Sequence, residues 1–82
     1  MSVKDKMVNR LLSMPNDYTF LELKGLSSKL GCVIQQDRNG SRCALITQSG
    51  SKYIFHKPHS YSYFKSYVIK DLISFLRKEG LI

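Results

Sequence analysis

Residues 32–56 have the sequence CVIQQDRNGSRCALITQSGSKYIFH, in which three short apolar runs are separated by turn residues. The Asn39-Gly40 step is a strong hairpin signal, and Gln48-Ser49-Gly50 provides a second short turn. The predicted strands are Cys32–Gln36, Arg42–Thr47 and Lys52–His56. Because both connections are short, we expect an antiparallel meander.

Two predicted helices precede these strands. Residues 2–14 form a short amphipathic helix that ends before Pro15. Its apolar face consists of Val3, Met7, Leu11 and Met14. The second helix begins with the capping box Thr19 and Glu22, and it ends at Gly31 in the left-handed conformation. Its buried residues are Leu23, Leu26 and Leu30.

A last helix follows the strands, from about Phe64 to Glu79. Pro58 closes the third strand because proline cannot donate to a sheet ladder. The core face of this helix consists of Val68, Leu72, Phe75 and Leu76. Gly80 ends the helix, and Leu81 folds back on the last turn.

The resulting order, α-α-β-β-β-α, is an α+β fold in a single domain of 82 residues. Without the additional N-terminal helix in residues 1–14, the order is α-β-β-β-α, which is the arrangement of the double-stranded-RNA-binding fold. Because side chains alternate along each strand, the helices should cover only one face of the sheet. A chain this short has no room for a doubly wound sheet or a barrel enzyme.

Composition and charge limit the classes of function. The chain has 13 lysines and arginines against 6 acidic residues, a net charge of +7. No apolar run approaches the length of a membrane span, and no secretory signal is visible, so we expect a cytoplasmic protein without membrane contact. We expect Cys32 and Cys43 to be small buried hydrophobic residues. With no Cys-x-x-Cys pair, neither a metal site nor a cofactor is expected.

The charge is concentrated in the second half of the chain. No acid occurs between Asp37 and Asp71, and this stretch contains Arg38, Arg42, Lys52, Lys57, Lys65 and Lys70, with His56 and His59. It also contains four tyrosines, Tyr53, Tyr61, Tyr63 and Tyr67. Lysine and arginine displace counterions from phosphates, and rings stack on bases, so this pattern favours RNA. The alternative is a solvated positive face that keeps the protein soluble.

Residues 19–82 resemble the HicA toxins in three places. These are Leu30-Gly31 before the first strand, Gly40-Ser41 at the start of the second, and His56-Lys57-Pro58-His59 with a terminal Gly80-Leu81. The resemblance implies a double-stranded-RNA-binding-like fold and a metal-independent messenger RNA endoribonuclease. It also implies a HicB-like antitoxin as partner, with the protein alone as a monomer or with the antitoxin as a hetero-oligomer. The usual HicA histidine after Gly-Ser is Arg42 here, so the alternative is a noncatalytic RNA-binding or antitoxin-binding module.

Two histidines remain for the proton transfers of RNA cleavage. We assign the main role to His59, which the meander could bring beside Arg42, and name His56 as the second candidate. The alternatives are a strand residue bonded to backbone for His56 and a helix-capping residue for His59. The predicted RNA contacts are Arg38, Ser41, Arg42, Lys57, Tyr61 and Lys65. Among the tyrosines, we expect core packing for Tyr53 and Tyr67 and base stacking for Tyr61 and Tyr63. An antitoxin would bring acids to Arg42, Lys57 and Lys65.

Overall fold

The computed structural model describes residues 2–38, 40–58 and 62–82. Three helices and three strands follow one another in the predicted order, which confirms the α+β class. Their bounds are α1 Val3–Leu12, α2 Phe20–Lys29, β1 Val33–Gln36, β2 Arg42–Ile46, β3 Lys52–His56 and α3 Ser66–Lys78.

The strands form an antiparallel sheet in the order β1-β2-β3, so the predicted meander is confirmed. β3 has the predicted bounds, whereas Cys32 and Thr47 lie just outside the ends of β1 and β2. The Asn-Gly turn falls partly outside the described residues, because Asn39 is not among them. In the second turn, Gly50 has a φ of 93°, a conformation that glycine adopts without steric cost.

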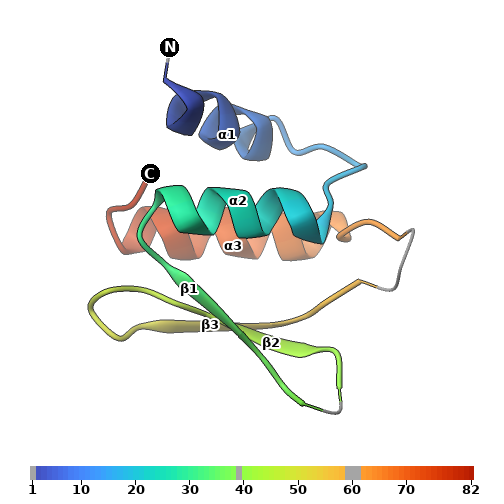
Figure 1. Cartoon of the computed structure of the whole chain (residues 1–82). Coiled ribbons are helices and arrows are strands. Elements are labelled where there is room, and N and C mark those ends of the chain that lie inside the picture. Colours follow the sequence, from blue (N-terminus) through green and yellow to red (C-terminus); the bar gives the residue numbers. More distant parts are fainter. Residues whose placement is uncertain (1, 39, 59–61) are drawn as a thin grey trace.

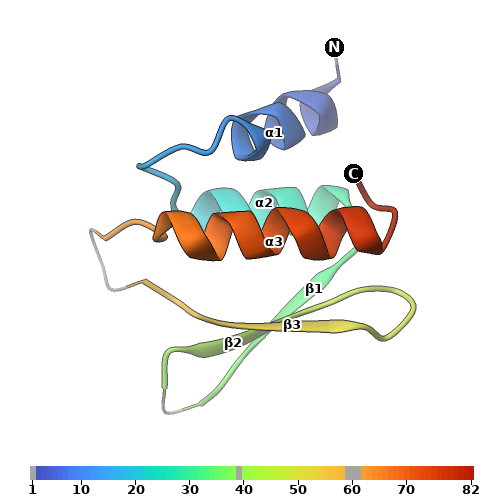
Figure 2. The same cartoon turned by 180° about the vertical axis from the view of Figure 1, so that it is seen from behind.

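The elements are arranged in layers. α2 and α3 lie side by side on one face of the sheet, and α1 lies on their far side (Figure 1). Seen from behind, α3 is in front, above β3, and the other face of the sheet has no helix on it (Figure 2). Along β3 the buried Phe55 alternates with the exposed Ile54 and His56. The prediction that the helices cover one face is therefore confirmed.

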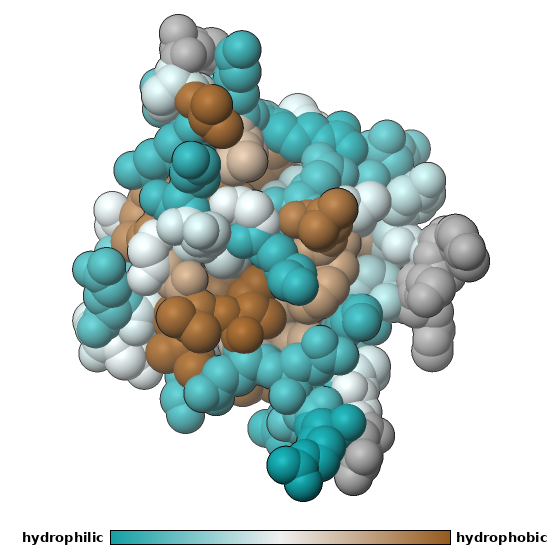
Figure 3. Space-filling view, in the orientation of Figure 1, coloured by the Kyte–Doolittle hydropathy of each residue, from teal (hydrophilic) through white to brown (hydrophobic). Residues whose placement is uncertain are grey.

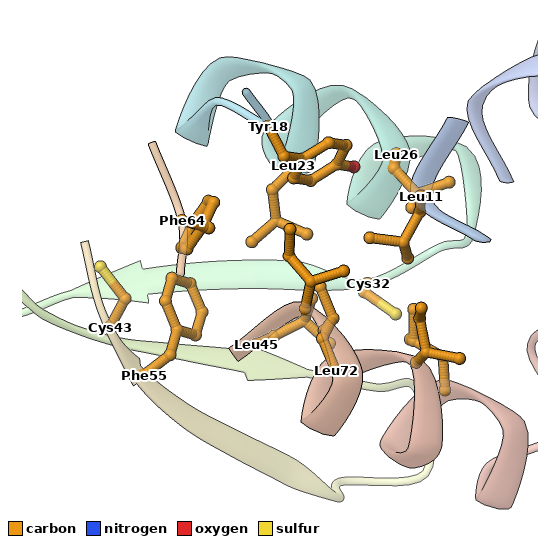
Figure 4. Packing of buried hydrophobic residues seen from close by; sticks show 13 residues of the cluster. Leu11, Tyr18, Leu23, Leu26, Cys32, Cys43, Leu45, Phe55, Phe64 and Leu72 are labelled. Carbon is orange, nitrogen blue, oxygen red and sulfur yellow. The ribbon is translucent and has the colours of Figure 1, made fainter. Parts of the chain in front are cut away.

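One hydrophobic core lies between the helices and the sheet (Figure 4). Every helix and strands β2 and β3 contribute side chains that are at most 8% exposed. The core consists of Leu11, Tyr18, Leu23, Leu26, Cys32, Cys43, Leu45, Phe55, Phe64, Ile69, Leu72, Ile73 and Leu76. Both cysteines are free and buried, as expected.

The signals for helix ends are confirmed. Thr19 and Glu22 form the complete capping box at the start of α2. Gly31 and Gly80 have positive φ, 76° and 73°. In each case the next residue donates its N–H back across the last turn, from Cys32 to Ser27 O and from Leu81 to Leu76 O. Both α2 and α3 therefore end in the Schellman arrangement.

The expected apolar faces of α1 and α3 are partly wrong. In α1, Leu11 is fully buried, whereas Val3, the first residue of the helix, is 57% exposed, and Met14 is 41% exposed because it lies beyond the last helical residue, Leu12. α3 begins at Ser66, later than predicted, and Phe64 packs into the core from the segment before it. The buried residues of α3 are Ile69, Leu72, Ile73 and Leu76, while Val68 and Phe75 are half-buried.

The remaining exposed apolar side chains are dispersed. From the α2 side, two small brown groups lie over α1 and α2, and a broader one lies toward the sheet, with hydrophilic side chains between them (Figure 3). No helix in the described part of the chain is long and apolar enough to cross a bilayer.

Candidate nucleic-acid interface

The paired ends of β2 and β3 bring the predicted site residues together. Arg42 and His56 are directly opposite each other in the register. The backbone N–H of Lys57 donates to Ser41 O at 2.6 Å, so the Arg42–His56 pair is the non-hydrogen-bonded kind, in which facing side chains lie closest. The Ser41 hydroxyl lies 3.4 Å from His56 Nδ1. The Ser41 hydroxyl and the His56 imidazole therefore lie next to each other at an exposed end of the paired strands, with Arg42 across from His56 in the register.

A groove of about 520 Å³ opens beside this junction, between β3 and the start of α3. Four predicted residues line it: Ser41, His56, Lys57 and Lys65. α3 begins there with Lys65 as its N-cap and has no acid in its first turn. The positive end of the helix therefore has no negative side chain of its own to offset it.

Arg42 and Arg38 are not among the residues that line this groove. Arg42 lines a smaller hollow of about 230 Å³, together with Lys52 and Ile54. That hollow lies on the sheet face without helices, and Ile54 lines both the hollow and the groove. Arg38 is exposed in the turn between β1 and β2. His59 and Tyr61 lie outside the described residues, and their assignments stay predictions.

Lys57 is held in place by an aromatic ring. Its Nζ lies 5.3 Å from the centre of the Phe20 ring, and Lys24 Nζ lies 5.7 Å from the same centre. Cation–π contacts of this kind orient an ammonium group and leave its N–H donors free for another acceptor. Lys24 is a cation that the sequence argument missed. Its i, i+4 spacing from Phe20 on α2 was the available signal.

The cations of the groove are not neutralised by nearby carboxylates. Within the described part of the chain, both ion pairs belong to Arg10, which binds Asp17 and Glu22 at 2.8 and 2.9 Å. No described carboxylate lies within 4.0 Å of Lys57 or Lys65. Asp71 is the acid among the described lining residues. The groove can therefore accept a polyanion at its cationic end.

The tyrosines of the groove have two different environments. Tyr53 is half-buried, as expected, and its hydroxyl donates to Val68 O at 3.4 Å. Burial raises the pKa of Tyr53, and the charge of Asp71 adds to this effect. Tyr67 is 64% exposed, so its predicted place in the core is wrong. Tyr63 is 52% exposed and lines the groove with Tyr67.

Among the described residues, neither the cysteine thiols nor the carboxylates form a second reactive or metal-binding site. Burial raises the pKa of both Cys32 and Cys43, which disfavours the reactive thiolate. Among residues 2–38, 40–58 and 62–82, no group of three His, Cys, Asp or Glu side chains could hold a metal ion.

In comparisons with known proteins, no family model, no curated protein and no solved structure matched the chain.

Proposed function

We propose that this protein binds RNA along the groove between β3 and α3 and is a ribonuclease toxin of HicA type. The observation that carries the proposal is the contact between Ser41 and His56, opposite Arg42 in the register, beside a groove whose lysines have no carboxylate partner among the described residues. Phosphate needs unpaired cations, and metal-independent RNA cleavage needs a titratable group beside them.

The positions of the family marks support this proposal. Without α1, the order is α-β-β-β-α with a β1-β2-β3 sheet, which fits the double-stranded-RNA-binding-like arrangement. Leu30-Gly31 ends α2, Gly40-Ser41 comes directly before β2, and Gly80-Leu81 ends α3. His56 is the last residue of β3.

The chemistry would be attack of the RNA 2′-hydroxyl on the adjacent phosphate, which forms the new P–O2′ bond as the P–O5′ bond breaks. One proton leaves the 2′ oxygen and one is given to the departing 5′ oxygen; His56 would take or give one of these protons, and Arg42, opposite it in the register, would hold the phosphate. The Ser41 hydroxyl would fix the orientation of the imidazole ring through Nδ1. His59 remains the other candidate for the proton-transfer role.

The test compares growth arrest and RNA cleavage for the wild type, His56→Ala and His59→Ala. General acid–base groups contribute about 100-fold or more, so loss of the active histidine should abolish cleavage while RNA binding remains. Loss in His56→Ala alone assigns the role to His56, and loss in His59→Ala alone assigns it to His59. Full cleavage by both variants would contradict a histidine mechanism.

The presence of an arginine at position 42 favours a second candidate function, a noncatalytic module that binds RNA or an antitoxin. It occupies the position at which HicA proteins usually have a histidine. A wild-type protein that binds RNA without cleaving it would support this reading. In either case a HicB-like partner would cover the groove by bringing acids to Lys57 and Lys65, and it would also bring acids to Arg42 in the neighbouring hollow.

A further inference from the structure

The aromatic residues of the described chain fall into two groups. Six of them form a continuous series of ring contacts with centroid separations of 5.6 to 6.3 Å: Tyr18, Phe20, Tyr53, Phe55, Phe64 and Phe75. Tyr63 and Tyr67 have no ring partner among the described residues, and both are more than half exposed. Both line the groove between β3 and α3.

The groove is electrically polarised along its length. Lys57 and Lys65 lie where β3 ends and α3 begins, and Asp71 lies six residues further along the helix, about 9 Å at 1.5 Å per residue. Tyr67 and Asp71 are four residues apart and so share one face of α3. A phosphate is favoured at the lysines and repelled at Asp71, so a nucleotide would enter with its base toward the acid.

A base in that orientation comes to Tyr67, which lies between Lys65 and Asp71, and Tyr63 lines the same groove beside Lys65. Stacking on an aromatic ring requires an unstacked base, which a duplex does not offer and a single strand does. We propose that Tyr67 and Tyr63 form a stacking platform that makes this groove select single-stranded RNA over duplex RNA. This inference rests on the proposed RNA binding, and it names the form of RNA bound.

The test measures binding of two labelled probes with equal numbers of phosphates, an unstructured single-stranded RNA and a blunt-ended, fully paired RNA duplex. The variants are Tyr67→Leu, which removes the ring, and Tyr67→Phe, which keeps it; Tyr63→Leu and Tyr63→Phe form a second matched pair. The wild type should prefer the single strand. A lost stacking contact should weaken its binding by about fivefold or more, while each phenylalanine variant stays close to wild type. The salt dependence should not change in any of them, because no charge is altered.

A second readout uses the intrinsic emission of tyrosine, since the chain contains no tryptophan. Single-stranded RNA should quench it, and an abasic strand of the same length should not. Equal affinity for both probes, or unchanged single-strand affinity in both leucine variants, would overturn the stacking platform and leave RNA binding standing. Absence of binding to either probe at low salt would overturn both proposals.

Discussion

At the scale of single residues, the outward direction of His56 is set by its neighbour Phe55. Phe55 is 4% exposed and packs against Phe64, so the alternation of β3 turns the next side chain away from the core. The register then places Arg42 opposite. A polar pair on the exposed face requires no desolvation, so both groups stay available to a ligand.

Asp71 offers the simplest test of the polarity of the groove. Asp71→Asn removes the acid among the described lining residues and keeps the size of the side chain. One charge about 10 Å from a phosphate contributes about 0.5 kcal/mol, so RNA affinity should rise about two- to threefold at low salt. Titration by fluorescence anisotropy measures this. If Asp71→Asn and the wild type bind RNA equally well, the RNA does not bind in this groove.

The sequence pattern predicted the buried or exposed side correctly for most residues. Tyr67 shows why it failed for some of them. The predicted core face of α3 assumed that the helix packs against the sheet. α3 also contacts α1, so the buried arc extends to Ile69 and Ile73. Tyr67 lies outside this arc. A single helical stripe cannot reveal a second packing partner that lies far away in the sequence.

At the scale of elements, Arg10 links α1 to the start of α2 through two ion pairs. Its Nε donates to Glu22 Oε2 at 2.9 Å, and one terminal nitrogen donates to Asp17 Oδ1 at 2.8 Å. Glu22 also accepts from the Thr19 backbone in the capping box at 3.2 Å. The hydrogen bond from Arg10 is the main cause of the lowered pKa of Glu22.

This pair predicts a dependence of stability on pH. A carboxyl whose pKa is lowered by folding stabilises the protein above its unfolded pKa, about 4.3, and this contribution is lost as the pH falls through the folded pKa. Arg10→Gln should therefore lower the melting temperature at pH near 7 and reduce the further loss on acidification. Lys4→Gln makes the same charge change on α1 and is the control. If acidification lowers the melting temperature equally in the two variants, the proposed contribution of the Arg10–Glu22 pair to stability is contradicted.

At the scale of the whole molecule, α1 contributes one fully buried side chain to the core. Leu11 is fully buried and belongs to the same cluster as the residues of α2, α3 and the sheet. Met7 packs against this cluster from the surface. Its methyl carbon lies 3.4 Å from the point where a Cβ atom added to Gly25 would be. A small domain buries little surface, so one such contact is a large share of its stability.

Leu11→Ala should lower the free energy of unfolding by about 2–5 kcal/mol, because it leaves a cavity between the layers. Val3→Ala on the same helix, at a side chain that is 57% exposed, should change it by less than about 0.5 kcal/mol. Urea denaturation followed by circular dichroism measures both. Equal, small effects would mean that α1 is not part of the core.

The strands and the layered arrangement could be predicted because their signals are local. Turn residues fixed where the strands end, and the short turns fixed their order and antiparallel pairing. The groove could not be predicted, because it depends on how α3 docks beside β3. The register places His56 opposite Arg42, and it depends on the length of the turn after Ile46; the predicted position of His59 beside Arg42 lies outside the described residues.

RNA binding through the lysines of the groove is the central claim, and its salt dependence tests it most directly. The measurement is the affinity for a single-stranded RNA of about eight nucleotides between about 50 and 200 mM salt. The logarithm of the binding constant should fall linearly with the logarithm of salt concentration. The double variant Lys57→Ala, Lys65→Ala should bind more weakly, with a slope shallower by about 1.4, since each phosphate contact on a single strand contributes about 0.7. Lys70→Ala, Lys78→Ala removes the same charge from α3 outside the groove and should keep the wild-type slope. No binding at the lowest salt, or the same slope in both double variants, would contradict the account.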